Sequence, residues 1–244
     1  MMNHTHSKTS VWPDVAKLFF GAMASLVFAV PGVTHAADNE LTAQEKQDGW
    51  VLLFDGKSVA QWKCKDKPMP EGQAQEGCIN TSKQGVYVSH FDRMFTNFHF
   101  MCDFRFEAKC NSGIFIHGTD LGGGDIHRGV EIQVFDSFGK AKPDKHDAGA
   151  VYDLLEPSKN AIKPAGEWNH IEIISQGSTL RIILNGETVI DTDFAKWTEA
   201  GKNPDGTKNK FKWAFKDQKP EGYIGLQDHG HPCWYKNLKV KPLQ

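Results

Sequence analysis

The residues best suited to chemistry lie in one short segment, residues 128–136 (RGVEIQVFD). If this segment is a strand, Glu131 and Gln133 point to one face and the aliphatic residues between them to the other. Asp136 joins that polar row only if a β-bulge at residues 134–135 inserts one extra residue. Glu131 could then move a proton while the amide and the second carboxyl hold a substrate. A solvated face of an antiparallel strand has the same alternation, so that interpretation stays open.

The rest of the chain predicts the sheets that must position this strand. Residues 98–107 place four phenylalanines and a cysteine on one face, as in a long half-buried strand. Asn185-Gly186 supplies the two positive φ angles of a type I′ turn and predicts a hairpin of 180–184 with 187–191. Further strands are expected at 49–54, 85–89, 112–117, 149–153, 168–175, 222–228 and 233–241, and a surface excursion with a helical turn at 198–217. Many strands without alternating helices favour an all-β sandwich of two antiparallel sheets.

The first 36 residues have the pattern of a signal peptide. Lys8 and Lys17 form a basic region, an apolar run follows, and the segment ends in Ala36, a small residue that suits cleavage. The apolar run is short for a membrane span, which needs roughly 20 residues, although an uncleaved anchor stays open. We therefore expect export to the periplasm or secretion, a mature chain of residues 37–244 and no membrane attachment after cleavage.

The composition of residues 37–244 indicates a single sandwich domain without affinity for nucleic acid. It holds 26 Lys and Arg against 29 Asp and Glu, a net charge of −3. The lysine-rich stretch at 208–219 also carries acidic residues, so it is interpreted as a solvated loop. No repeat or linker divides the segment, and sandwiches of about 200 residues commonly form one domain. The oligomeric state is left open.

All five cysteines follow the expected cleavage site, where an oxidising compartment permits disulfides. Cys64 and Cys78 flank a polar loop rich in proline and glycine, so we predict a bond between them. The odd total leaves at least one thiol free. No two cysteines have the spacing of zinc ligands.

An ordered set of motifs resembles the 3-keto-disaccharide hydrolase domain family. The motifs are residues 49–58 (GWVLLFDGKS) with Trp62, 111–116 (NSGIFI), 129–136 (GVEIQVFD), 149–152 (GAVY), 167–169 (EWN), 184–186 (LNG) and 225–230 (GLQDHG). They run from about residue 48 to the C-terminus. The resemblance implies a concanavalin A-like jelly-roll sandwich whose concave face binds sugar. It also implies hydrolysis of glycosides that carry a ketone at C3.

The chemistry that the resemblance implies can be checked against the residues. A C3 ketone acidifies the C2 hydrogen, so a base can form an enolate that expels the C1 substituent before water adds back. This route needs a base near neutrality, groups that hold the enolate oxygen, and an acid. Glu131 and His229 are the candidates for base and acid. Gln133, Asp136 and His117 are candidates to hold the oxygens or a divalent metal.

The remaining candidates come from the same motifs. Asn111, Tyr152, Gln227 and Arg128 are expected to bind substrate. A metal cluster could join Glu131 to further groups, namely His117, Asp125 and His127, although their spacing is not diagnostic. For Asn111 and His229, an ordinary structural role in a turn stays open. The small-molecule partner would be a carbohydrate, and the cofactor is left open, with a divalent metal ion as the candidate.

Two other functions fit the same fold. The spacing of Glu131, Gln133 and Asp136 resembles the catalytic strand of laminarinase-type retaining glucanases, which need two carboxyl groups about 5 to 5.5 Å apart. In that comparison, glutamine replaces the central aspartate. The third possibility is a non-catalytic carbohydrate-binding module, because this architecture hosts both lectins and enzymes.

Overall fold

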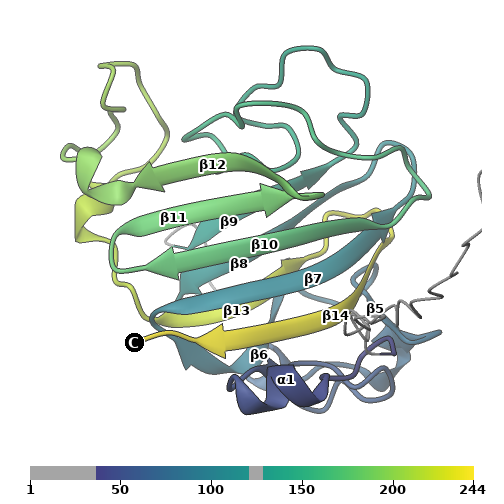
Figure 1. The fold of residues 1–244 in the computed structure, drawn as a ribbon. Helices are drawn as coiled ribbons and strands as arrows, with labels where there is room; N and C mark the ends of the chain where they lie inside the picture. The colour runs from purple at the N-terminus through teal and green to yellow at the C-terminus, as the bar shows by residue number, and fades with distance from the viewer. Residues whose placement is uncertain (1–36, 121–128) are drawn as a thin grey trace, which may run out of the picture. The chain divides into compact units, whose positions relative to one another are not determined.

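Two antiparallel sheets form a sandwich in the computed structural model, which describes residues 37–120 and 129–244 (Figure 1). The eight-stranded sheet contains, in spatial order, β12 (Glu187–Asp193), β11 (Thr179–Leu184), β10 (Asn169–Gln176), β7 (Phe98–Phe106), β14 (Cys233–Pro242), β5 (Cys78–Asn80) and β4 (Ala74–Gln75), with β1 (Val51–Leu52) also paired to β14. The six-stranded sheet contains β3 (Lys67–Pro68), β2 (Trp62–Cys64), β6 (Val88–Phe95), β13 (Gly222–Gln227), β8 (Asn111–Gly118) and β9 (Val130–Phe135). The predicted all-β jelly-roll sandwich is confirmed.

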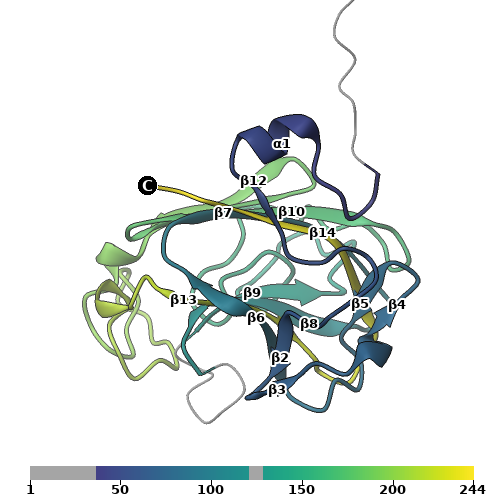
Figure 2. The same ribbon diagram turned by 90° about the horizontal axis from the view of Figure 1, so that it is seen from below.

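Short helices complete the described elements. They are α1 (Ala43–Gln47) and the 3₁₀ turns η1 (Glu71–Gln73), η3 (Phe194–Lys196) and η4 (Phe215–Asp217). Figure 2 shows α1 beside the eight-stranded sheet. Thr42 and Glu45 form a capping box at the start of α1, and Glu45 also accepts a hydrogen bond from Lys239 of β14 at 2.9 Å. No helix among the described residues is long and apolar enough to cross a membrane.

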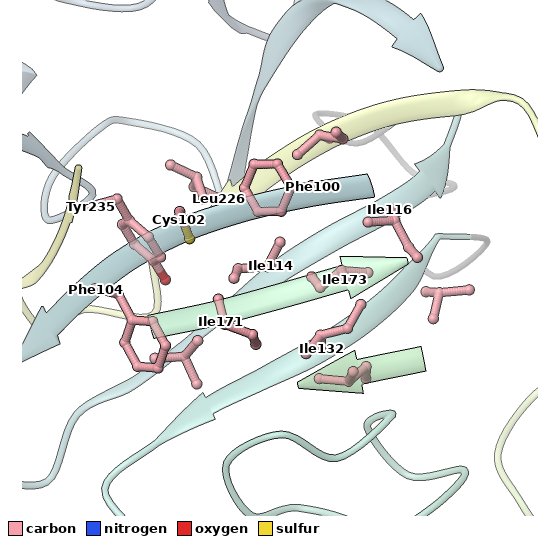
Figure 3. Packing of buried hydrophobic residues seen from close by; sticks show 14 of the residues in the cluster. Phe100, Cys102, Phe104, Ile114, Ile116, Ile132, Ile171, Ile173, Leu226 and Tyr235 are labelled. Atoms are coloured by element: carbon pink, nitrogen blue, oxygen red, sulfur yellow. The ribbon is translucent and has the colours of Figure 1, made fainter. Parts of the chain in front are cut away.

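The core lies between the two sheets because each strand alternates as the sequence predicts. The five predicted apolar side chains of β7 are all buried. From the other sheet, Ile114 of β8 and Ile132 of β9 meet Ile171 and Ile173 of β10 (Figure 3). The opposite side chains of β8, β9 and β13 therefore point away from the core. We call that side the outer face of the six-stranded sheet.

The predicted strands agree with the structure in part. The hairpin at Asn185-Gly186 is confirmed, with φ of 52° and 83° at the two turn residues. Residues 149–153 are not a strand: they make single bridges at Val151, and their backbone runs along β9 instead. The strand expected at 85–89 begins at Val88 and continues to Phe95, and the one at 49–54 shortens to two residues. In the excursion at 198–217, η4 is the expected helical turn, and its Phe215 is buried.

The predicted disulfide between Cys64 and Cys78 is wrong. All five thiols are free and buried. Cys64 belongs to the six-stranded sheet and its sulfur contacts the Gln84 carbonyl, whereas Cys78 belongs to the other sheet and contacts the Glu76 carbonyl. The polar loop between them is thus organised by short strand pairs and not by a covalent bond.

Candidate active site

Glu131 lies on the outer face of β9, where the sequence analysis placed it. Its Oε1 accepts a hydrogen bond from Gln227 Nε2 of β13 at 2.8 Å. Between these two strands runs β8, and at this point it carries Gly113. A Cβ at residue 113 would lie 2.9 Å from Glu131 Oε1 and 3.1 Å from Glu131 Cγ. The missing side chain of Gly113 therefore gives the carboxyl its space.

The surroundings of Glu131 tune its acidity for proton transfer. Burial raises the pKa of Glu131 from the ordinary 4.5 to about 7, against a hydrogen bond from Gln227 and the positive charge of Lys210, which both lower it. A carboxyl with this pKa is ionised in part at neutral pH and holds a proton strongly enough to remove one from carbon. These are the properties of a general base.

Gln227 connects the carboxyl to an aromatic pair. Its amide nitrogen also contacts the hydroxyl oxygen of Tyr87 at 2.8 Å, and the Tyr87 ring packs edge-on against His229 at 5.8 Å between centroids. Burial and the charge of Glu131 raise the pKa of Tyr87 to about 12. His229 is exposed. The structure thus brings His229 toward the site through Tyr87 and leaves it accessible to solvent.

Gln133 and Asn111 form a second polar group on the same face. Gln133 Nε2 donates to the Asn111 side-chain oxygen at 3.4 Å and to the His146 carbonyl at 3.3 Å. The side-chain oxygens of Gln133 and Gln227 are buried and have no hydrogen-bond partner among the residues that the structure describes. Buried acceptors of this kind are normally satisfied, so both amide oxygens lack the partner that such a group ordinarily has.

Tyr152 approaches the site on a segment that follows β9. Its backbone nitrogen donates to the Glu131 carbonyl at 2.9 Å, which fixes the segment along the strand. The Tyr152 ring lies 5.0 Å from the His146 ring and 4.0 Å from Lys210 Nζ. Tyr152 thus belongs to the same site as Glu131, as the sequence analysis expected.

Asp136 does not join the row, because the predicted bulge at residues 134–135 is wrong. β9 pairs with β8 in unbroken register to Phe135, which takes the outward position two residues beyond Gln133. Asp136 Oδ2 instead accepts a hydrogen bond from the Lys109 backbone nitrogen at 2.8 Å. Its carboxylate stabilises the turn before β8.

His117 is also misplaced by the sequence analysis, because a bulge occurs there. The pairing of β8 with β13 shifts register at this level, and His117 has φ of 59°. Its side chain is buried in the core, with Nε2 2.7 Å from Ser175 Oγ of the opposite sheet. Burial lowers the pKa of His117 to about 4. It therefore cannot hold a substrate on the outer face.

Three predicted site residues lie outside the described residues: Asp125 and His127 of the metal cluster, and Arg128, which was expected to bind substrate. Among the residues in the ranges 37–120 and 129–244, no three His, Cys, Asp or Glu side chains form a metal-binding group. The divalent metal remains a prediction.

The sequence analysis missed three contributors to the site. Gly113 was noted only as part of a motif, Tyr87 was not singled out, and Lys210 was assigned to a solvated loop. The alternation of β8 could have shown that Gly113 faces outward beside Glu131. For Tyr87 and Lys210 no local signal exists, because long-range packing brings them to β9.

The outer face of the six-stranded sheet thus gathers a carboxyl whose pKa is raised to about 7, buried amide groups and aromatic rings. This arrangement suits acid–base chemistry on a polar ligand. The chain belongs to the 3-keto-alpha-glucoside-1,2-lyase-like domain family, whose model matches residues 49–241.

Similar proteins agree with this assignment. A 3-keto-disaccharide hydrolase of Bacteroides thetaiotaomicron is 27% identical over 229 residues, which cover 80% of this chain and 79% of the relative. A crystal structure from Parabacteroides distasonis, described as a candidate glycosyl hydrolase, is 27% identical with a TM-score of 0.69 and covers 85% of this chain and 100% of its own. A second structure from that organism, described in the same way, is 29% identical with a TM-score of 0.61, covering 75% of this chain and 99% of its own. These findings support a glycosidase-type enzyme.

We expect Gly113→Ala to lower kcat while the protein stays folded. The added methyl group would displace the Glu131 carboxyl, which can move because it ends a flexible side chain. Gly72→Ala is the matched control, since a Cβ at residue 72 meets nothing within 4 Å. Steady-state kinetics and thermal melts of both variants measure the effect. Equal kcat in the two variants would show that Gly113 is not required for the position of Glu131.

Proposed function

We propose that this protein hydrolyses glycosides oxidised to a ketone at C3, by elimination followed by addition of water. The main support is the Glu131 carboxyl, whose pKa burial raises to about 7. Gln227 holds it by a hydrogen bond, and the absence of a side chain at Gly113 leaves space for it. Ordinary glycosidic bonds need strong acid assistance, whereas removal of a proton beside a ketone needs a base of this strength. The family and the Bacteroides relative support the same substrate class.

In the proposed reaction, Glu131 removes the proton from C2. The C–H electron pair forms the C2–C3 double bond, and the carbonyl electrons move to the C3 oxygen as an enolate. The enolate then re-forms the ketone and expels the C1 oxygen, which takes a proton from His229. Water then adds across the C1–C2 double bond, with hydroxyl at C1 and hydrogen at C2. In this step Glu131 loses the proton that it took and His229 regains the one that it gave. The net reaction is hydrolysis.

The unpaired amide oxygens orient the sugar in this proposal. The side-chain oxygens of Gln133 and Gln227 are buried without a partner, so in this proposal each amide turns toward the sugar when a hydroxyl donor binds. The separation of the Gln133 and Gln227 side chains along the outer face determines which hydroxyl groups of the sugar they bind. Asn111 acts through Gln133, to which it is hydrogen-bonded.

The glucanase alternative receives less support from the geometry. Retaining hydrolysis needs a second carboxyl beside the first. Asp136, the candidate for that role, is bonded to the Lys109 backbone, and Phe135 occupies the outward position. A binding module alone would not need a carboxyl tuned to near neutrality.

The test compares a glycoside with its 3-keto derivative, each incubated with the mature protein before and after chelation of metals. Cleavage of the keto form alone supports the proposal. Cleavage of the plain glycoside would support the glucanase mechanism, and binding without cleavage would support a module. Loss of activity on chelation, with recovery on adding a divalent ion, would assign a metal to the reaction.

We further propose that the enzyme acts in the periplasm or outside the cell, after removal of residues 1–36. Those residues lie outside the described part, so the support is their sequence pattern alone. Determination of the N-terminal residue of the protein recovered from a secreting host tests it. A mature chain beginning at Ala37 is expected.

A further inference from the structure

Lys210 lies at the edge of the candidate active site although its sequence context is that of a surface loop. Its backbone nitrogen donates to Asp153 Oδ2 at 3.3 Å, and its ammonium nitrogen lies 4.0 Å from the centre of the Tyr152 ring. The same nitrogen lies 5.6 Å from the Phe211 ring. These contacts place the ammonium group over Tyr152, whose backbone is hydrogen-bonded to Glu131 of β9.

The charges around Lys210 include Glu131. The Lys210 side chain is exposed, but partial desolvation lowers the pKa of its ammonium group. The carboxylates of Asp153 and Glu131 oppose this shift, and the nearby charge of Lys145 adds to it. Lys210 in turn is the cation that lowers the pKa of Glu131. Lys145 is held by Asp153 Oδ1 at 2.7 Å. Of the two lysines, Lys210 is therefore the one that interacts electrostatically with the proposed base.

We propose that Lys210 is a catalytic residue whose ammonium group stabilises the enolate formed on the C3 oxygen of a 3-keto-glycoside. This inference rests on the proposed function. When the C2 proton moves to Glu131, the carboxylate becomes neutral and one negative charge appears on the substrate oxygen. Lys210 keeps its positive charge throughout. The electrostatic partner of Lys210 thus changes from the carboxylate to the enolate, without any movement of a charged protein group.

This arrangement favours the transition state over the bound substrate. The keto oxygen of the substrate is neutral and interacts weakly with a cation, whereas the developing enolate carries charge. The Tyr152 ring holds the ammonium group through a cation–π contact, and no carboxylate of residues 37–120 or 129–244 forms an ion pair with it. Removal of Lys210 should therefore lower kcat more than it weakens binding.

The test uses Lys210→Met, Lys210→Arg and, as matched control, Lys208→Met, which changes another exposed lysine of the same loop. We expect Lys210→Met to lower kcat on the 3-keto-glycoside about 10²- to 10³-fold with a small change in KM, as for loss of one oxyanion donor. Lys210→Arg should recover part of kcat, since it keeps the charge. Lys208→Met should equal the unmodified protein.

A second readout separates catalysis from a structural role. Without the cation, the pKa of Glu131 should rise, so the pH midpoint of kcat/KM should move upward in Lys210→Met and stay in place in Lys208→Met. NMR titration of the Glu131 carboxyl without substrate measures the same shift. Unchanged kcat and pH midpoint, with the unmodified protein active on the keto substrate, would overturn the role of Lys210 alone. Failure of the unmodified protein to cleave that substrate would overturn the proposed function and this inference together.

Discussion

Glu131→Gln is expected to abolish turnover of a 3-keto-glycoside and, above pH 7, to make the protein more stable. The amide keeps the shape of the side chain but cannot take a proton. In the folded protein the pKa of Glu131 is raised to about 7, so ionisation of this carboxyl opposes folding at alkaline pH. Because the pKa of Glu131 is higher in the folded protein than in the unfolded chain, its protonated form stabilises the fold. This contribution to the free energy of unfolding is fully present below pH 4.5 and is lost as the pH rises through about 7.

The size of the stability effect follows from the same shift. A difference of roughly 2.5 pKa units corresponds to up to about 3 kcal/mol at pH 8. Melting temperatures of Glu131→Gln and the unmodified protein should therefore diverge above pH 7 and converge below pH 4.5. Glu156→Gln, at an exposed residue, is the control and should change neither activity nor the pH dependence. Retained turnover would remove Glu131 from the mechanism.

Ile132→Ala is expected to show the opposite pattern, with a large loss of stability. Ile132 is fully buried between the sheets, where it lies near Ile114 and Ile171 (Figure 3). The cavity left by three missing carbon atoms should cost about 2 to 5 kcal/mol. In a domain of this size, each kcal/mol lowers the melting temperature by about 2 to 4 °C. Denaturant and thermal unfolding measure both quantities.

The control for this variant is Ile174→Ala, which makes the same chemical change at a partly exposed position of β10. It should cost much less. At a temperature where both variants are folded, Ile132→Ala should keep most of its kcat, because its side chain points away from Glu131. If Ile132→Ala is as stable as the unmodified protein and Glu131→Gln unfolds, Glu131 would face the core and Ile132 the outer face, contrary to the structure.

Alternation of polar and apolar residues was enough to predict β7, the outward position of Glu131 and the hairpin at Asn185-Gly186. These features depend on local rules: the two-residue period of a strand and the φ angles of a turn. The family motifs added the jelly-roll architecture. They also indicated Gln227, whose hydrogen bond to Glu131 spans β8.

Register was the part that sequence could not predict. Asp136 could join the polar row only through a bulge at residues 134–135, whereas β9 is regular there and the irregularity occurs at His117 of β8. A bulge depends on how two strands meet over their whole length, so neither residue type nor spacing locates it. The bulge assumed in β9 moved Asp136 into the site, and the unexpected bulge in β8 moved His117 into the core.

The sequence also could not predict which residues far apart in the chain come together at the site. Tyr87 and Lys210 reach Glu131 from segments more than 40 residues away on either side, and each is placed by tertiary packing. The expected Cys64–Cys78 bond failed for the same reason, since the two residues belong to different sheets.

The buried bond between His117 and Ser175 gives the two layers a defined alignment. Apolar contacts between sheets have no preferred direction, so a sandwich held by them alone tolerates sliding. A hydrogen bond of 2.7 Å has a narrow geometry, and displacement by one residue pair would leave two polar groups unpaired in the core. Each would cost about 1 to 3 kcal/mol. Replacing both residues with apolar ones of similar volume could therefore preserve overall stability and yet allow several alignments of one sheet against the other.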